Sequence, residues 1–541
     1  MFDRKPPLLQ EEAFSLFPLA GIPAYLCTMK STVRVRFAPS PTGGLHLGGV
    51  RTALFNYLFA KKQGGSFVLR IEDTDQTRFV PGAEQYILDC LEWCGISPDE
   101  GPHQPGPYGP YRQSERKPIY RKFAEQLIQQ GHAYYAFDTP EELESMRERF
   151  KSESTPSPQY NAALRGSMRN SLTLDPAEVN RLLSAGTPHV IRIHVPVGKK
   201  LVLNDMIRGE VEFDTSEVDD KVLLKADGMP TYHLAVVVDD YHMKITHAFR
   251  GEEWLPSAPV HLLLWEYLGW KQAMPLWAHL PLILKPDGHG KLSKRDGDRL
   301  GFPVFAMDWY DPRTQELTRG FKEMGFLPEA FINMLALLGW NDGSGEEVLD
   351  RSQLCERFSI ERVHKGGARF DFEKAKWFNQ EWIKRKENIE LLPSVEQLLA
   401  QEGLSASSEQ LVVLIGLVKE RCQTLKDFIP QLDYFFKDPV SMDWNSISSK
   451  WDSKKNVFFE EWVKQLSELS EWTAVAIENS FKQVAGEQGI KPGDVQLPLR
   501  IMLVGGKFGP PVFIIAQYLH KDVTLKRITS ALTVLNHAAA S

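Results

Sequence analysis

Cysteine is scarce in this chain, and its distribution excludes a disulfide framework. The 541 residues contain five cysteines, which are scattered and include no C-x-x-C pair. Cys90 and Cys94 lie in one helix-like stretch, where we expect buried side chains rather than metal ligands. A scattered, odd-numbered set indicates a reduced, intracellular protein.

Long apolar runs, an excess of positive charge and internal repeats are also missing. No apolar run approaches the roughly 18 to 20 residues that a membrane helix needs, so we expect no membrane-spanning segment. The formal net charge is −7 at pH 7, whereas a general nucleic-acid-binding protein is usually basic. This charge argues against non-specific nucleic-acid binding, but it leaves room for RNA on one locally positive face.

The first 29 residues differ in character from the rest of the chain. They contain no long apolar core, and Asp3, Glu11 and Glu12 are acidic residues that a transit peptide usually avoids. Met29 stands shortly before the first convincing strand. We therefore expect a poorly ordered N-terminal extension or an upstream start, with an organellar presequence as the alternative.

A strand, a glycine-rich turn, a helix and a second strand succeed one another from residue 33. Apolar residues alternate with arginine over 33–37, recur at helical spacing over 50–62, and form the buried strand "SFVLRI" after that. This order predicts a βαβ unit and a doubly wound parallel sheet, whose ligands bind beyond the carboxyl ends of the strands. Arg36, the turn and Glu72 all fall at that edge.

The remaining pattern predicts an insertion and a helical C-terminal part. A Pro- and Gly-dense passage near residue 110 marks a boundary, and helices with the strand-like "HVIRIHVP" extend from it to about residue 215. The sheet pattern then resumes, with "HLAVVV" interpreted as a short strand and "KITHAFRGEEW" as a strand leading to Arg250. Beyond about residue 320, helical periodicity dominates.

The turn "FAPSPTGGLHLGG", residues 37–49, contains more glycine and proline than a plain turn requires. It does not match the dinucleotide-binding pattern G-x-G-x-x-G. Two glycines at a helix start bring backbone N–H groups against a phosphate, and His46 can hydrogen-bond phosphate oxygens as charge develops on them. Considered alone, the segment also fits a crowded turn with a surface histidine.

The segment "KLSKR", residues 291–295, is a second candidate for phosphate binding. Its two lysines stand three residues apart on a loop flanked by glycines, so they can close over the β- and γ-phosphates of ATP. It is not a Walker A loop, because the earlier glycine is missing and Leu292 replaces the Ser or Thr after the lysine. Considered alone, it also fits a solvated basic loop.

Together, "PSPTGGLHLGG" and "KLSKR" resemble the HIGH and KMSKS motifs of class I aminoacyl-tRNA synthetases, in the form used by bacterial-type glutamyl-tRNA synthetases. Supporting stretches are "RIEDTD", "FVPGAE", "DGMPTYHLAVVVDD", "RGEEW" and "PLRIMLVGGKFGP". The resemblance covers residues 33–541 nearly continuously. It implies an α/β fold with a class I Rossmann-like, doubly wound parallel sheet, an inserted α/β acceptor-binding domain and an all-α C-terminal anticodon-binding region.

The resemblance also implies a division of the chain into consecutive parts. The expected ranges are 1–29 for the extension, 30–112 and 215–285 for the two halves of the catalytic domain, 113–214 for the inserted acceptor-end-binding domain, 286–390 for the KMSKS loop and stem-contact region, and 391–541 for the helical anticodon-binding region. The segment 365–386 combines seven Lys and Arg residues with several aromatics. That composition suits RNA phosphates and unstacked bases, although a charged helical surface explains it as well.

The implied activity is that of a glutamate–tRNA ligase. ATP activates L-glutamate to glutamyl-adenylate, and the glutamyl group then passes to the 3′-terminal adenosine of tRNA(Glu). We expect Mg²⁺ to come with ATP, a monomeric cytoplasmic protein and no membrane partner, and members of this type often need bound tRNA before they activate glutamate. Two alternatives remain: a non-discriminating enzyme that also charges tRNA(Gln), and a catalytically inactive RNA-binding paralogue.

The resemblance assigns site residues position by position. The expected catalytic residues are His46, Lys291 and Lys294. The expected ATP-binding residues are Pro39, Gly43, His46, Gly48, Gly49, Lys291, Leu292, Ser293, Lys294 and Arg295. The expected glutamate-binding residues are Arg36, Ala38, Ser40, Glu72, Tyr232 and Arg250. A guanidinium suits the side-chain carboxylate of glutamate, although Arg36 also fits the polar face of an amphipathic strand.

One departure from the family concerns zinc. Many bacterial members bind zinc in the inserted domain through C-x-C and a further cysteine. In this chain Ala136, Phe137 and Asp138 stand at the C-x-C position, and no cysteine occurs between residues 95 and 354. Because tetrahedral zinc needs about four N or S ligands, we expect no structural zinc and no other protein metal site.

Overall fold

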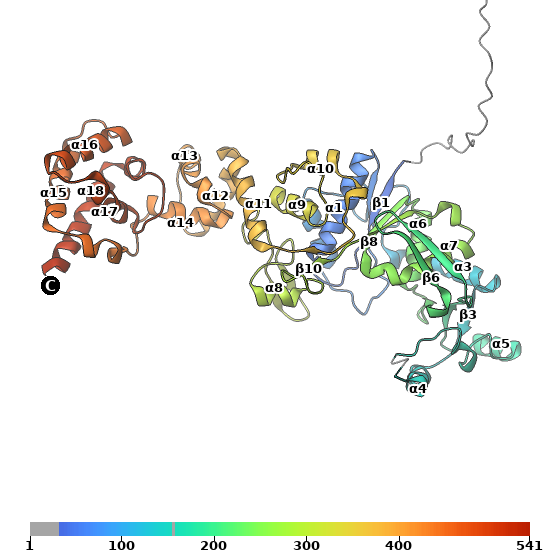
Figure 1. Cartoon of the computed structure of the whole chain (residues 1–541). Helices are drawn as coiled ribbons and strands as arrows, with labels where there is room; N and C mark the ends of the chain where they lie inside the picture. The colour runs from blue at the N-terminus through green and yellow to red at the C-terminus, as the bar shows by residue number, and fades with distance from the viewer. Residues whose placement is uncertain (1–31, 154–156, 541) are drawn as a thin grey trace, which may run out of the picture. The chain divides into compact units, whose positions relative to one another are not determined.

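The structure is a computed structural model that describes residues 32–153 and 157–540 of the chain (Figure 1). The N-terminal extension expected over residues 1–29 lies outside the described residues. Cys90 and Cys94 are buried, and the four cysteines of the described part are free thiols. Their burial confirms the prediction from the sequence.

The largest sheet of the described residues has six strands, in the order β2-β1-β8-β9-β5-β6. Its strands are β1 (Arg34–Phe37), β2 (Ser66–Leu69), β5 (Lys200–Asp205), β6 (Gly209–Asp214), β8 (His247–Gly251) and β9 (Leu276–Leu280). All neighbouring pairs are parallel except β5 and β6, which form an antiparallel hairpin. The chain winds outward in both directions from β1 and β8, so the topological switch point lies between these two strands.

Helices pack on both faces of this sheet, as a doubly wound fold requires. Helix α1 (Leu47–Lys62) connects β1 to β2, and Val50, Leu54 and Leu58 on it are fully buried. Because successive strand residues face opposite sides, Phe249 joins the α1 cluster while Ala248 joins the cluster of helices α6 (Tyr232–His242) and α7 (Ala258–Tyr267). The predicted βαβ unit and parallel sheet are confirmed.

The stretch "HLAVVV" is not a strand, and that interpretation was wrong. It lies within α6, in which residues 234–240 are all buried. A helix that is apolar on every side shows no 3.6-residue period, so a short segment of it cannot be distinguished from a buried strand. The correction brings Tyr232 to the start of a helix and places Asp239 and Asp240 inside the protein.

A separate three-stranded antiparallel sheet takes two strands from the range expected for the insertion, 113–214, and its third strand from beyond residue 214. It consists of β3 (Ala133–Ala136), β4 (Val190–Ile193) and β7 (Val222–Leu224), accompanied by helices α3 (Lys117–Gln129), α4 (Pro140–Phe150) and α5 (Pro176–Ser184). Strand β4 confirms the interpretation of "HVIRIHVP". The β5–β6 hairpin falls within the expected range 113–214, yet β5 pairs with β9 of the main sheet. Because β5 pairs with β9, Asp205 at the carboxyl end of β5 lies at the edge of the main sheet where ligands of a parallel sheet bind.

Every regular element from residue 388 to 540 is a helix. Helices α8 to α11 span Lys294–Leu300, Pro328–Leu337, Arg351–Arg357 and Phe372–Arg385. Helices α12 to α18 span Asn388–Gln401, Ser408–Val418, Phe428–Leu432, Ser453–Glu468, Ala474–Glu487, Pro492–Val504 and Val512–Ala540. Two apolar cores stabilise them, one around Leu414 and the other around Trp462. The predicted helical C-terminal part is confirmed.

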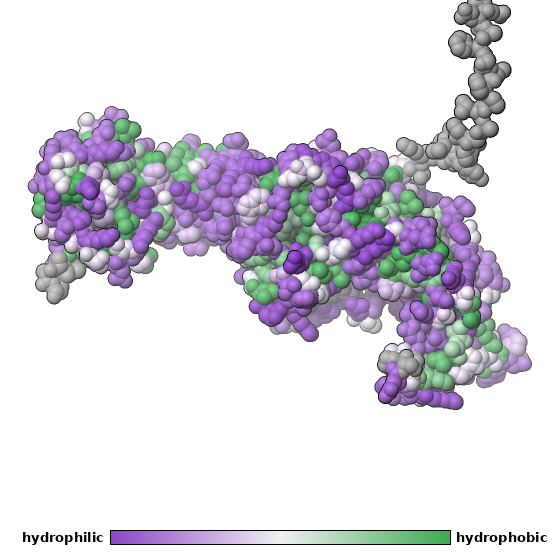
Figure 2. Space-filling view, in the orientation of Figure 1, coloured by the Kyte–Doolittle hydropathy of each residue, from purple (hydrophilic) through white to green (hydrophobic). Residues whose placement is uncertain are grey.

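Over the described residues, the face of the molecule drawn in Figure 2 has no single large apolar or polar region. Figure 2 shows hydrophilic and hydrophobic residues interspersed over the visible face. None of the helices in residues 32–153 and 157–540 has the length and apolar character required to cross a membrane.

Candidate active site

A cavity of about 540 Å³ lies at the carboxyl ends of β1 and β8. Thirteen of the residues predicted from the sequence line it: Arg36, Ala38, Ser40, His46, Gly48, Gly49, Glu72, Tyr232, Arg250, Lys291, Leu292, Ser293 and Lys294. The turn around residue 46 and the loop around residue 291, far apart in the sequence, therefore face the same space. This position is the switch point at which parallel α/β sheets bind ligands.

Three of the predicted ATP-binding residues do not line this cavity. The carbonyl oxygen of Pro39 accepts a hydrogen bond from the backbone N–H of Glu72 at 3.0 Å, which fastens the turn to the end of β2. Gly43 lines a neighbouring cavity of about 250 Å³. Arg295 is exposed on α8.

His46 caps the N-terminus of α1 and keeps one ring nitrogen uncommitted. Its Nδ1 accepts from the backbone N–H of Gly48 at 3.3 Å, so a neutral ring carries its proton on Nε2. Burial, together with the nearby charge of Lys291, lowers the pKa of His46 to about 4. The buried Nε2 has no partner among the described residues. The cavity therefore contains a neutral N–H donor at a helix N-terminus, which suits a phosphate oxygen.

Close packing within the protein requires glycine at two positions of the turn, 44 and 49. A Cβ on Gly44 would lie 2.8 Å from Trp309, and one on Gly49 would lie 2.7 Å from Leu45. At Gly48 the nearest atom would be Nδ1 of His46 at 3.9 Å, so no contact within the protein requires glycine there. The free space at Gly48 faces the cavity.

The two loop lysines form ion pairs at the surface. Lys291 Nζ lies 2.6 Å from Glu253 Oε1, and Lys294 Nζ lies 3.4 Å from Glu316 Oε2. Between them, Leu292 is 1% exposed, and its backbone N–H donates to the carbonyl of Ile283 at 2.8 Å. The loop is thus anchored by a buried leucine, while its ammonium groups are held by exposed and replaceable partners.

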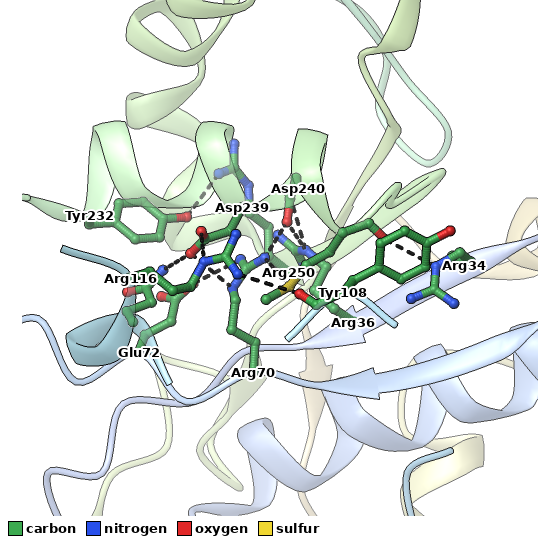
Figure 3. Close-up of polar contacts among 12 residues, drawn as sticks. Arg34, Arg36, Arg70, Glu72, Tyr108, Arg116, Tyr232, Asp239, Asp240 and Arg250 are labelled. Carbon is green, nitrogen blue, oxygen red and sulfur yellow. Dashed lines mark hydrogen bonds and ion pairs between the residues drawn. The ribbon is translucent and has the colours of Figure 1, made fainter. Parts of the chain in front are cut away.

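The floor of the cavity is a buried network of charges (Figure 3). Arg36 Nε and Arg70 Nη1 both donate to Asp240 Oδ1, at 3.1 and 2.6 Å, and Arg70 Nη2 donates to Glu72 Oε1 at 3.0 Å. Burial alone would raise the pKa of Asp240, but Arg36 and Arg70 hold it below its ordinary value. Burial raises the pKa of Glu72, and the same two arginines offset part of this rise.

Arg250 is held differently from Arg36. It donates from Nη1 to Tyr232 Oη at 2.9 Å (Figure 3) and to His261 Nδ1 at 3.1 Å, and from Nε to His279 Nε2 at 3.0 Å. The buried Nη2 has no partner in the part of the chain that the structure describes. All three acceptors are uncharged, so the positive charge of Arg250 is not neutralised by a direct carboxylate partner.

Several residues of this site escaped the sequence interpretation. Arg70 and Asp240 lay within the quoted stretches "RIEDTD" and "DGMPTYHLAVVVDD", but the interpretation of "HLAVVV", residues 233–238, as a strand gave no reason to place Asp240 inside the protein. His261 and His279 carried no motif signal. Arg51, which also lines the cavity, resembled any polar residue of a helix.

The described residues contain no group of three or more His, Cys, Asp or Glu that could hold a metal ion. At the C-x-C position, Asp138 Oδ2 instead accepts from Tyr160 Oη at 2.9 Å, and Oδ1 accepts from the backbone N–H of Arg169 at 2.7 Å. Ala136 is buried in β3. Hydrogen bonds therefore satisfy Asp138 where a metal ligand would stand.

The cavity can thus do two things chemically. Guanidinium groups and one carboxylate at its floor suit a small molecule that carries both an ammonium and carboxylates. A helix N-terminus, an imidazole donor and two ammonium groups at its other end suit a polyphosphate.

Comparisons with known proteins agree with this geometry. The family model for class I tRNA synthetases (E and Q), catalytic domain, matches residues 32–377, and an anticodon-binding domain model matches residues 375–532. A glutamate–tRNA ligase of Amoebophilus asiaticus is 50% identical over 507 residues, covering 94% of this chain and 99% of the relative. One of Porphyromonas gingivalis is 49% identical over 516 residues, covering 94% and 99%. The crystal structure of a glutamate tRNA ligase from Elizabethkingia meningosepticum, in complex with its amino acid, superposes with a TM-score of 0.90 at 48% identity, covering 93% of this chain and 100% of that one.

Proposed function

The chain belongs to the class I tRNA synthetases for glutamate and glutamine and acts as a glutamate–tRNA ligase, and we propose how the residues of its cavity divide the reaction. The observation that carries the proposal is a single cavity with a guanidinium-rich floor at one end and a donor-rich phosphate site at the other. The two ends match the two small substrates, glutamate and ATP.

The floor binds glutamate. Arg36 and Arg250 hold the side-chain carboxylate, for which a guanidinium has the right shape and charge. Glu72 takes the substrate ammonium group. Ser40, Ala38 and Tyr232 shape the remaining wall, and Tyr232 also orients Arg250 through its hydroxyl group.

The other end binds ATP and stabilises the reacting phosphate. The glutamate α-carboxylate attacks the α-phosphorus, an O–P bond forms, and the bond to pyrophosphate breaks. His46 Nε2–H stabilises the charge that develops on the phosphate oxygens. Gly48 orients the ring, because its backbone N–H donates to His46 Nδ1, and it leaves room for the phosphate. Lys291 and Lys294 hold the pyrophosphate after exchanging their present carboxylate partners for it. No covalent bond to the protein is needed, because positioning and electrostatics carry the step.

The other predicted ATP-binding residues act through the backbone and the loop. Gly49 allows α1 to start close to the nucleotide, while Leu292 and Ser293 anchor the lysine loop. Pro39 and Gly43 shape the turn, and Arg295 remains a prediction for a loop closed over ATP.

Mg²⁺ is expected with ATP, but the cavity offers it no dedicated protein site. Its lining contains two carboxylates, Glu72 paired with Arg70 and Glu253 paired with Lys291. Elemental analysis of the purified protein is expected to find no stoichiometric zinc, and zinc bound one to one would contradict this.

The third substrate is tRNA, and the 2′-hydroxyl of its terminal adenosine attacks the acyl carbon of the adenylate with release of AMP and a proton. We assign the acceptor end to the inserted region, the anticodon to the C-terminal helices and the stem to the basic segment 365–386. A monomeric state and a cytoplasmic location complete the proposal.

A charging assay with radiolabelled glutamate, ATP and purified tRNA(Glu) or tRNA(Gln) tests this function. We expect glutamate to be attached to tRNA(Glu), and no attachment to either tRNA would refute the function. Charging of both tRNAs would identify a non-discriminating enzyme. tRNA must be present throughout, since activation without it can be silent.

A further inference from the structure

Two of the three neutral acceptors around Arg250 have no part in the reaction steps proposed above. His279 and His261 each accept one of its hydrogen bonds, and both are almost completely buried, at 0% and 1% exposed. His233 lies behind His261, with 3.4 Å between its Nδ1 and His261 Nε2. Burial lowers the pKa of all three histidines, so they are neutral near pH 7.

The hydrogen bonds determine the tautomer of each ring. A guanidinium has only donors, so every ring nitrogen that faces Arg250 must be an acceptor. His279 therefore carries its proton on Nδ1, which lies 2.6 Å from Asp205 Oδ2. His261 carries its proton on Nε2, which points toward His233.

Asp205 is placed to enforce this tautomer. It ends β5, and its side chain accepts four hydrogen bonds and donates none. Oδ1 accepts from the backbone N–H groups of Ile207 and Arg208, at 3.0 and 2.9 Å. Oδ2 accepts from the backbone N–H of His279 at 3.1 Å and from its Nδ1–H. Only an acceptor-only group, such as an ionised carboxylate, satisfies all four donors.

The consequence concerns the charge of Arg250. Asp240 contacts Arg36 directly, and much of the charge of that arginine is neutralised. Asp205 reaches Arg250 only through the ring of His279, so it orients the guanidinium without pairing with it. Nη2 of Arg250 remains buried and, within the described residues, without a partner.

We propose that Asp205 and His279 are positioning residues for glutamate recognition, which hold Arg250 through a neutral acceptor so that its charge and its Nη2 are left for the substrate side-chain carboxylate. This inference rests on the proposed function. It assigns a role to Asp205, which lies in the β5–β6 hairpin, 74 positions before His279, and which belongs to none of the motifs.

The variant D205N tests the inference with almost no change in volume. The amide oxygen must face Ile207 and Arg208, so the NH₂ group faces the two donors of His279. His279 then moves its proton to Nε2, where it opposes the N–H of Arg250. Leaving buried donors unpaired costs about 1–3 kcal/mol, so we expect the KM for glutamate to rise roughly 5- to 150-fold. The KM values for ATP and tRNA should not change.

Two substitutions at His279 make the test independent of one variant. In H279Q, the amide oxygen can accept from Arg250 while the NH₂ group donates to Asp205, so we expect this variant to keep most of the wild-type affinity for glutamate. H279L removes the acceptor and should resemble D205N. All variants are first compared by urea unfolding, because a purely structural role would change stability and both small-molecule KM values together.

Asp99 supplies a matched control. It accepts from the backbone N–H of Phe67 at 2.8 Å and from Lys61 Nζ at 2.6 Å, beside β2 and away from the cavity lining. D99N makes the same chemical change without reaching Arg250, and it should leave the KM for glutamate unaltered.

The outcomes separate the inference from the function on which it rests. Folded D205N and H279L proteins with the wild-type KM for glutamate would overturn the inference, as would equal rises in the KM for glutamate and for ATP. A wild-type protein that charges no tRNA would overturn the proposed function first, and the inference with it. A selective rise that H279Q largely avoids supports it.

Discussion

The two ends of the cavity are built in opposite ways. At the end proposed for glutamate, Arg36 and Asp240 are each about 5% exposed at their side chains and share a network with Arg70. At the end proposed for the phosphates, the side chain of Lys291 is 54% exposed and that of its partner Glu253 is 40% exposed. Removing one partner of a buried pair costs several kcal/mol, whereas an exposed pair contributes about 0–1 kcal/mol.

The difference suits the buried end to selecting the amino acid and the exposed end to moving during the reaction. A rigid floor whose charges are already oriented discriminates between amino acids without reorganising. Weak surface pairs can be exchanged for phosphates at little cost, so the lysine loop can close and reopen in each cycle. Substitutions at the two ends test this contrast.

Arg36→Ala should give the largest loss. It removes one guanidinium from the glutamate side chain and leaves Asp240 with Arg70 alone. Truncating one partner of a buried charge pair costs about 2–5 kcal/mol, so kcat/KM for glutamate should fall roughly 30-fold to several thousand-fold. Steady-state charging kinetics measure this, and urea unfolding establishes that the variant is folded. Unchanged catalytic efficiency would refute the role of Arg36, and Lys291→Ala, with an unchanged KM for glutamate, is the control.

His46→Ala should act at the end of the cavity proposed for ATP, and it should lower kcat rather than raise the KM for glutamate. Loss of one donor to a developing oxyanion lowers kcat by roughly 10²- to 10³-fold. The KM for glutamate should remain close to the wild-type value, because His46 contacts no residue of the floor network. Pre-steady-state formation of glutamyl-adenylate in the presence of tRNA measures the step. An unchanged rate would show that Nε2 does not reach the phosphate.

His46 should also make stability depend on pH. Its pKa is about 4 in the folded protein, below the ordinary value of 6.5. The folded state therefore resists protonation, and the stability contribution is complete above pH 6.5 and is lost as pH falls toward 4. Urea unfolding of the wild type and of H46N at pH 7.5 and 5.0 measures it. The acid loss should be smaller in H46N, by no more than about 2 kcal/mol. Equal losses would contradict the lowered pKa.

Glu253→Gln should have the smallest effect, and it should improve ATP binding rather than weaken it. It releases Lys291 from an exposed pair worth at most about 1 kcal/mol, so the KM for ATP should fall by no more than about fivefold. Glu316→Gln should do less, because its pair with Lys294 is longer and its side chain is more exposed. A raised KM for ATP would mean that Glu253 helps to bind the nucleotide rather than competing with it.

Local patterns were sufficient where a signal lies within one short segment. The alternation over residues 33–37, the glycine-rich turn and the spacing of Val50, Leu54 and Leu58 predicted β1, the start of α1 and the βαβ unit. The motif positions placed thirteen site residues around one cavity. Local patterns failed for "HLAVVV", residues 233–238, because burial of 234–240 on all sides removed the helical period.

The sequence was sufficient to predict the strand and helix on either side of the glycine-rich turn, residues 37–49. It also gave the order of that turn and the lysine segment, residues 291–295, and the chemical character of their side chains. Tertiary structure alone decided which charges meet. Asp240 is 204 residues from Arg36, and Asp205 belongs to a hairpin that joins the main sheet from within the inserted range. Such partners leave no periodic trace, because a salt bridge or a tautomer is set by distances across packed elements and not by neighbours along the chain.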